Sequence, residues 1–253
     1  MNDVTARHQA IFFEVFESLP RQGPGNRGCT ARALQLCGEL PPSPAVLDLG
    51  CGTGAQTLHL AELTNGSIVA LDNHAPSIER LRAIIAERGL DGRIRAEIGD
   101  MANPDLPPGS FDLAWSEGAF YNIGIDRALQ LCRTLLRPGG CLAFTDAVWL
   151  TADPPPEVKE VFDAEYPGMG TAAAVIDSIT RAGFSPAGHF TLPDEAWWDD
   201  FYTPMLRRID ELERAHTGDA EAIAVLADLR REPEMHRRYS YSYGYEFFVA
   251  RLP

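Results

Sequence analysis

Short apolar runs alternate with amphipathic stretches over most of the first 150 residues. Five of these runs are rich in branched and aliphatic residues and predict β-strands at residues 45–49, 67–72, 94–98, 111–115 and 141–145. Between them, apolar residues recur at helical spacing over residues 57–63, 75–88 and 125–136. Strands that alternate with helices of this length predict βαβ units and a parallel sheet covered by helices on both faces.

The rhythm changes after Val148, where a Pro-rich connector leads into two predicted helices, 158–164 and 172–182. Two further strands are predicted at residues 186–191 and 246–250. About fifty residues separate these two strands, which is too long for a hairpin loop. This insertion contains an aromatic-rich stretch at 192–209 and a charged helix at 219–231.

The chain is therefore interpreted as one α/β domain over residues 1–253, with two helical additions. The first is an N-terminal segment, 1–40, which begins with a helix from Val4 to Leu19. The second is a helical cap, 192–243, inserted before the last strand. Just before that strand, Tyr239, Tyr241, Tyr243 and Tyr245 recur at every second position, so in an extended segment they would share one face.

Composition narrows the range of partners. With 45% hydrophobic and 23% charged residues the chain can form a sizeable core. Its formal net charge of -14 disfavours nucleic acid and anionic membrane surfaces. No apolar run reaches the roughly 18 residues of a membrane span, and the N-terminus does not resemble a signal peptide, so a cytoplasmic protein is expected. The five cysteines form no metal-ligand pattern and are read as free thiols, and no metal site is predicted.

A glycine-rich turn carries the strongest chemical signal. Asp48-Leu49-Gly50-Cys51-Gly52-Thr53-Gly54 ends the first predicted strand and precedes a helix. Glycines in such a turn let backbone amides approach a ligand that side chains would block. The spacing is GxGxG, which differs from the GxGxxG dinucleotide fingerprint and lacks the Lys of a phosphate-binding loop. Ala55 and Gln56 follow the turn instead of that Lys, and the acidic Asp48 before it suits a ligand with a cationic part, although a tight turn without a ligand is the structural alternative.

Acidic residues also end the second and third predicted strands. Asp72 can accept both hydroxyls of a ribose, or it can cap the following helix. Asp100, in Gly99-Asp100-Met101, can accept a hydrogen bond from an adenine amino group while Met101 packs on the ring, or it can form an Asx turn. At the end of the fourth strand, residues 115–122 mix Ser116, Glu117, Tyr121 and Asn122, a polar cluster that could orient a substrate or accept its proton.

Together these residues resemble the class I S-adenosylmethionine-dependent methyltransferases, and among them the small-molecule, ubiquinone/menaquinone-biosynthesis-like (type 11) group. Asp48 to Gly54 is similar to that family's first motif, and Leu136-Arg137-Pro138-Gly139-Gly140 to its marker before the fifth strand. The resemblance covers residues 43–190 and the final strand. It implies a Rossmann-like sheet of seven strands in the order 3-2-1-4-5-7-6, with only the seventh antiparallel. The long connection before the last strand departs from the family pattern.

The resemblance also implies a cofactor, S-adenosyl-L-methionine, with S-adenosyl-L-homocysteine as its product, and a small-molecule acceptor. The N-terminal segment 1–40 would cover the cofactor, and its Gly-Pro stretch at residues 21–27 would place Gln22 or Arg27 near the cofactor carboxylate or the substrate, or would be a plain loop. If the acceptor must lose a proton, Glu117, Tyr121 and His189 are candidate bases in that order. The implied cofactor-binding residues are Asp48, Gly50, Cys51, Gly52, Gly54, Asp72, Asn73, Gly99, Asp100, Met101 and Ser116.

The sequence leaves three points open. A catalytically inactive methyltransferase-like binding protein has the same motifs, and a nicotinamide-dependent oxidoreductase shares the ribose-binding acid. The acceptor atom, N, O, S or C, is not specified. A homodimer is compatible with the sequence.

Overall fold

Eight strands form one sheet in the computed structural model, which describes residues 6–253. Their order is β3-β2-β1-β4-β5-β8-β7, with the short β6 pairing with β5 outside this path. The pairs β5–β8 and β7–β8 are antiparallel, and the pairs among β1 to β6 are parallel. The strands are β1 (Ala45–Leu49), β2 (Ser67–Asp72), β3 (Ile94–Ile98), β4 (Phe111–Glu117), β5 (Leu136–Trp149), β6 (Gly170–Thr171), β7 (Ser185–Thr191) and β8 (Tyr243–Arg251).

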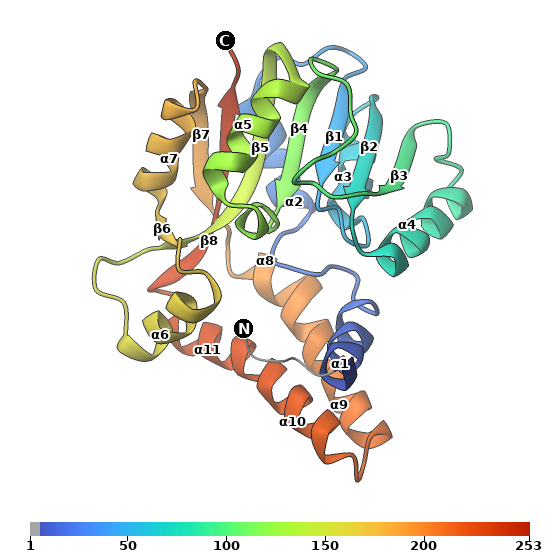
Figure 1. Cartoon of the computed structure of the whole chain (residues 1–253), viewed down its shortest axis with the longest axis vertical. Helices are drawn as coiled ribbons and strands as arrows, with labels where there is room; N and C mark the ends of the chain where they lie inside the picture. Colours follow the sequence, from blue (N-terminus) through green and yellow to red (C-terminus); the bar gives the residue numbers. More distant parts are fainter. Residues whose placement is uncertain (1–5) are drawn as a thin grey trace.

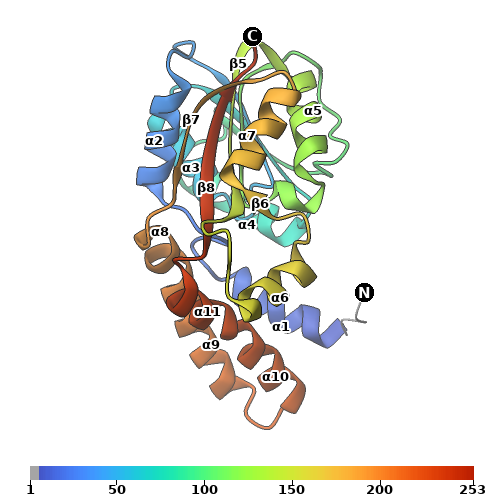
Figure 2. The same cartoon turned by 90° about the vertical axis from the view of Figure 1, so that its left-hand side faces the viewer.

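Without the two-residue β6, this is the predicted 3-2-1-4-5-7-6 order with one antiparallel strand, and the predicted fold class is confirmed. The helices α2, α3 and α4 cover one face of the sheet, and α5 and α7 cover the other (Figures 1 and 2). These helices are α2 (Arg27–Cys37), α3 (Ala55–Leu63), α4 (Ala75–Glu87), α5 (Ile125–Leu135) and α7 (Ala172–Arg181).

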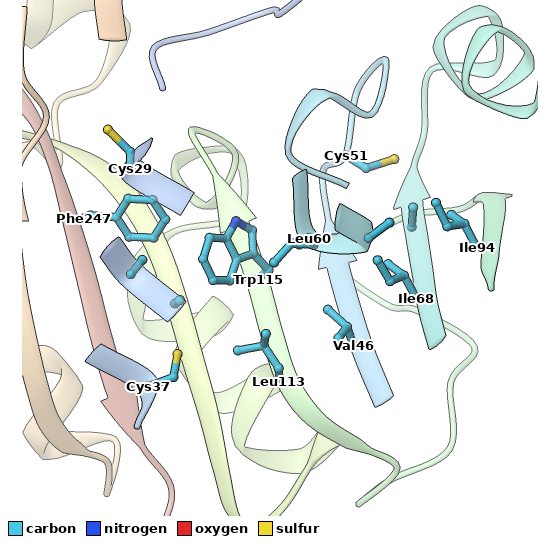
Figure 3. Close-up of a cluster of buried hydrophobic side chains, with 14 of the residues drawn as sticks. Cys29, Cys37, Val46, Cys51, Leu60, Ile68, Ile94, Leu113, Trp115 and Phe247 are labelled. Atoms are coloured by element: carbon cyan, nitrogen blue, oxygen red, sulfur yellow. The ribbon is translucent and has the colours of Figure 1, made fainter. Parts of the chain in front are cut away.

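Alternating residues of the central strands point into two separate cores. Leu113 and Trp115 of β4 face the α2–α4 side, whereas Ala114 faces α5 and α7. Trp115 is fully buried, and its ring meets Phe247 of β8 edge to face, at 5.2 Å between ring centroids (Figure 3). Because β4 is apolar on both faces, its position is fixed in the middle of the sheet.

A third core lies beyond the carboxyl ends of the parallel strands, where the N-terminal helix meets the later helices (Figure 1). Ile11 and Val15 of α1 pack with Met205 and Ile209 of α9 and with Leu226 of α10. The elements of this helical layer are α1 (Ala6–Phe16), α6 (Pro156–Glu165), α8 (Glu195–Trp197), η2 (Trp198–Tyr202), α9 (Thr203–Ala215), α10 (Ala220–Leu229) and α11 (Arg231–Tyr239).

The helical layer differs from the sequence prediction near its C-terminal end. The helix predicted at 219–231 corresponds to α10, and the chain then turns at Arg230 and forms a further helix, α11, to Tyr239, which was not predicted. Consequently the prediction of four alternating tyrosines in an extended segment is wrong: Tyr239 ends a helix, Tyr241 is 66% exposed in a turn, and only the last two lie on β8. Acidic residues in the first turn of α11 and basic ones in its last turn favour the helix. The predicted N-terminal helix, Val4 to Leu19, corresponds to α1, and its first two residues lie outside the described residues.

Candidate active site

A cavity of about 830 Å³ lies between the carboxyl ends of β1 to β4 and the helical layer. We call its two parts the strand end and the cap end. The strand end is lined by Gly50, Cys51, Gly52, Asp72, Asn73, Gly99, Asp100 and Met101. The cap end is lined by Phe12, Phe16, Tyr121, Glu165, Phe201, Glu232 and Tyr245. The cavity therefore brings together residues from both halves of the chain.

The glycine turn forms the floor of the strand end. Gly50, Gly52 and Gly54 have φ values of +73°, +52° and +86°, a conformation that favours glycine. The amides of Gly50 and Cys51 both donate to the carbonyl of Leu71, at 2.8 and 3.1 Å, which holds the turn against β2. A Cβ on Gly50 would overlap that of Ala119, so the turn leaves no room for a side chain there.

Asp72 links this turn to the next strand. Its Oδ2 accepts from the amide of Gly52, and its Oδ1 from the amide of His74, each at 2.8 Å. A carboxylate has about four acceptor positions, so two remain for ligand hydroxyls. Asp100 accepts from the amide of Ala102 at 2.8 Å and also keeps acceptor capacity toward the cavity.

Asp48, Gly54 and Ser116 lie beneath the cavity wall and do not line it. Asp48 is fully buried and accepts from Thr57 Oγ1 at 2.5 Å and from Gln56 Nε2 at 3.3 Å. Burial raises the pKa of Asp48 to about 7, although these hydrogen bonds oppose the shift. Ser116 is also fully buried, and its Oγ has no hydrogen-bond partner among residues 6–253. The predicted site is thus divided between a lining layer and a supporting layer.

Arg21 is a site residue that the sequence analysis missed. Its side chain is 4% exposed, lines the cavity, forms an ion pair with Glu117 and donates to the carbonyls of Gly23 and Pro24. Its Nη1 has no acceptor among residues 6–253. A buried guanidinium with a free N–H favours an additional anionic or carbonyl ligand. The Gly-Pro-Gly turn that follows Arg21 is the signal that could have identified it.

The sequence predicted Gln22 and Arg27 as ligands instead of Arg21, and only one of them lines the cavity. Gln22 lines the cavity, and its Oε1 accepts from the amide of Thr53 at 3.2 Å. Arg27 points to solvent and pairs with Glu62 at 3.0 Å, so it lies outside the cavity.

The three candidate bases also differ in position. Glu117 lines the cavity, but its Oε1 accepts from Trp115 Nε1 at 2.7 Å and its Oε2 accepts from Arg21. Tyr121 is 43% exposed at the cavity wall, and desolvation raises its pKa, which keeps it neutral. His189 lies on β7, pairs with Glu246 and does not line the cavity. Both oxygens of Glu117 are therefore engaged, an arrangement that favours holding Arg21 in place.

Two carboxylates at the cap end were not identified from the sequence. Glu232 of α11 accepts from Tyr202 Oη at 2.9 Å. Desolvation raises the pKa of Glu232 to about 7, and the nearby Glu165 adds to the shift. Both residues are exposed toward the cavities that they line, and desolvation by the surrounding helices also raises the pKa of Glu165 on α6. Glu232 and Glu165 are 67 residues apart and meet only through packing of the helical layer.

Other chemistries find little support in the part of the chain that the structure describes. No group of three His, Cys, Asp or Glu residues there could hold a metal ion. All five cysteines are buried free thiols, and burial beside Asp48 and Asp72 raises the pKa of the Cys51 thiol well above its usual range. Of the helices within residues 6–253, none combines the length and the apolar character needed to cross a membrane.

Comparisons with known proteins agree with this geometry. Residues 46–140 match a family model described as a methyltransferase domain. The dimethylglycine N-methyltransferase of Parasynechococcus marenigrum is 34% identical over 189 residues, which are 72% of this chain and 62% of that protein. The nocamycin O-methyltransferase of Saccharothrix syringae is 35% identical over 184 residues, which are 60% of this chain and 64% of that protein.

The chain thus spans somewhat less than two thirds of the length of these curated relatives. Among solved structures, a SAM-dependent methyltransferase from Geobacter sulfurreducens in complex with S-adenosyl-L-homocysteine superposes with a TM-score of 0.82. That comparison covers 96% of this chain and 98% of the other at 20% identity, a level that shows a shared fold. The acceptor atoms named in the relatives differ, nitrogen in one and oxygen in the other.

Proposed function

We propose that the chain is a class I S-adenosylmethionine-dependent methyltransferase and that it transfers a methyl group from S-adenosylmethionine to a small-molecule acceptor. The observation that carries this proposal is the alignment of the glycine turn, Asp72 and Asp100 along one wall of a single cavity. Its volume of about 830 Å³ lies in the roughly 300–1,000 Å³ range of small-molecule sites.

The residues at the strand end fit this cofactor. Asp72 would accept the ribose hydroxyls through its free acceptor positions, and Asp100 would accept from the adenine amino group, with Met101 against the ring. The backbone of Gly50 to Gly52 would lie under the methionyl part. Asp48 and Ser116 support this wall from below.

Arg21 and Gln22 are proposed to bind the cofactor carboxylate. The free Nη1 of Arg21 supplies an N–H in a buried position, where a charge-assisted hydrogen bond is strong. Glu117 would then be a positioning residue, because it holds the guanidinium in the cavity wall. The N-terminal segment would be tied to β4 through this pair.

When bound, the cofactor supplies a methyl group already activated for displacement by a nucleophile. The protein then has to orient the acceptor, exclude water and remove a proton where the acceptor carries one. At the cap end Phe12, Phe16 and Phe201 line the cavity, and these apolar side chains would limit the contact of a bound acceptor with water.

Calorimetric titration with S-adenosylhomocysteine, and in parallel with NAD⁺, tests the proposal. We expect micromolar binding of S-adenosylhomocysteine and none of NAD⁺, because the third glycine stands at position 54, one residue earlier than in the GxGxxG pyrophosphate fingerprint. Binding of NAD⁺ in preference, or no binding of S-adenosylhomocysteine, would contradict the proposal. Formation of S-adenosylhomocysteine from S-adenosylmethionine over a panel of amines, phenols and carboxylic acids then separates an active enzyme from an inactive binding protein.

A further inference from the structure

The cavity of the candidate active site adjoins a second cavity of about 580 Å³ within the helical layer. The second cavity lies between α1, α6, α10 and α11. Four residues line both cavities: Phe12, Phe16, Glu165 and Glu232. We call these four the junction. An elongated acceptor could therefore extend from the cap end, past the junction, into the helical layer.

The second cavity has an acidic wall. Its carboxylates are Glu157, Glu165, Asp228, Glu232 and Glu234, and its basic side chains are His8, Arg231 and Arg238. Arg231 already pairs with Asp228 at 3.0 Å. With His neutral, the five carboxylates outnumber the two arginines. At the junction itself both polar residues are acidic and the other two are aromatic.

The immediate surroundings of Glu232 suit a positive charge. Tyr202 Oη of η2 donates to one oxygen and Glu165 of α6 adds negative charge. Burial raises the pKa of Tyr243 and Tyr245 of β8, and the charge of Glu232 adds to both shifts. None of these groups is cationic. Phe16 and Phe201 lie next to each other, at 6.3 Å between ring centroids, on the same wall. Aromatic faces beside carboxylates stabilise a bound ammonium, and more so when water is excluded.

The cationic side chains of the first cavity are engaged elsewhere. Arg21 is buried in its ion pair with Glu117, and its free Nη1 is assigned above to the cofactor. Arg127 donates to the carbonyl of Ala102, beside Asp100. A carboxylate on the acceptor would therefore meet Glu165 and Glu232 without a basic residue at the junction.

From these contacts we infer that the acceptor is an elongated cationic amine without a carboxylate near its nitrogen, bound at the junction by Glu165 and Glu232. The inference rests on the proposed function and specifies its substrate class. The ammonium would enter charged and pass its N–H proton to the Glu232 carboxylate, which frees the lone pair of the nitrogen. Desolvation and Glu165 favour protonated Glu232, so this carboxylate is suited to accept the proton.

Four probes of equal chain length test this inference: hexylamine, hexanol, hexanoate and 2-aminohexanoate, whose carboxylate lies next to its nitrogen. Each is titrated into the protein with and without saturating S-adenosylhomocysteine. We expect hexylamine to bind at least tenfold more tightly than hexanol, and both carboxylates to bind more weakly than hexanol. Equal or tighter binding of hexanol or of either carboxylate would overturn the inference.

The variant Glu232→Gln keeps the acceptor for Tyr202 and removes the charge. We expect it to weaken hexylamine binding about tenfold and to leave hexanol and S-adenosylhomocysteine binding within twofold. Glu160→Gln, on the exposed face of α6 outside both cavities, is the matched control and should change none of these affinities. Glu165→Gln gives a second, independent change at the junction, with an expected loss in the same direction.

The pH dependence of hexylamine affinity is a second test, because a mere loss of packing in the variant would not change it. Hexylamine binding to the unmodified protein should strengthen as pH rises through about 7, because Glu232 ionises while the amine stays protonated. Glu232→Gln should flatten this rise, and an unchanged pH profile would contradict the role of Glu232. Failure of S-adenosylhomocysteine binding would count against the proposed function, whereas loss of amine preference alone would count against this inference.

Discussion

The strand end and the cap end of one cavity are built in different ways. At the strand end, the lining residues follow parallel strands within about fifty residues of chain, and backbone amides make much of the surface. At the cap end, the lining side chains come from α1, α6, η2, α11 and β8, which span nearly the whole chain. Most cap-end residues contribute side chains held by helix packing, whereas Tyr121 lies in the turn after β4 and Tyr245 lies on β8.

Because the two ends are built differently, they suit different kinds of ligand. A turn fixed by three glycines with positive φ keeps one backbone shape, so the strand end suits a constant ligand. Side chains on packed helices can be exchanged while the sheet stays intact, so the cap end can be adapted to different acceptors. Changes at the strand end should therefore act on cofactor affinity, and changes at the cap end on acceptor affinity.

Gly50→Val should give the largest effect on cofactor affinity. A Cβ at this position overlaps Ala119 and also requires a strained positive φ, so the turn must open. We expect S-adenosylhomocysteine binding to weaken at least about 100-fold, or about 2.7 kcal/mol, by calorimetry.

Gly139→Val is the matched control, because it has φ of +76° and open space around its Cβ. It should lose about 1 kcal/mol of stability from backbone strain and keep its cofactor affinity. If both variants lose affinity equally, the strand end does not depend on the shape of the turn.

Asp72→Ala removes an acceptor that serves both the turn and the proposed ribose. We expect about a thirtyfold loss of S-adenosylhomocysteine affinity, or about 2 kcal/mol, in the range of hydrogen bonds to charged groups. Glu165→Ala removes a carboxylate from the cap end and should change the same affinity less than threefold. Similar losses in both variants would break the distinction between the two ends.

The strand end could be predicted because its signals are local in sequence. The turn, Asp72 and Asp100 each follow a strand, and parallel strands bring their carboxyl ends to one edge. Arg21 was missed, although the adjacent Gln22 was identified, because its role depends on an ion pair with a residue 96 positions away. Sequence spacing does not report such a contact.

The cap end was harder to predict for the same reason. Glu165 and Glu232 lie on two different helices, and the turn at Arg230 sets the direction of α11. No Gly or Pro stands at Arg230 to mark this turn, so the sequence did not indicate that a second helix follows it. Helix packing, rather than a local motif, assembles this half of the cavity.

The stability of the unliganded protein should fall as pH rises from about 4 to about 7. In the folded protein the pKa of Asp48 is raised from 3.8 to about 7 by burial. The unfolded chain therefore releases this proton first, and stability is lost until the folded group also ionises. Asp146 and Glu232, each with a pKa raised to about 7, contribute in the same direction.

Asp48→Asn should reduce this dependence at the strand end. Its stability relative to the unmodified protein should rise by about 1.5 kcal/mol between pH 5 and pH 7, less than the full shift because the site relaxes. Thermal unfolding over pH 5 to 8 measures this, with an expected difference of about 3–6 °C. A parallel pH profile for both proteins would mean that Asp48 is ionised in the fold at pH 5.

Arg27→Ala should give the smallest effect on stability and on cofactor affinity, because Arg27 lies outside the cavity. Arg27 and Glu62 form an ion pair on the surface, with side chains 56% and 48% exposed, and such pairs contribute about 0.2–1 kcal/mol at most. We expect a change in unfolding free energy below about 0.5 kcal/mol and S-adenosylhomocysteine affinity within twofold. Arg21→Ala, only six residues earlier in the chain, should weaken that affinity about tenfold, because its guanidinium is buried in the cavity wall. If both variants kept the same affinity for S-adenosylhomocysteine in calorimetry, Arg21 would not bind the carboxylate of the cofactor. The glycine turn alone would then bind this carboxylate, and the N-terminal segment would cover the cavity without contributing a ligand.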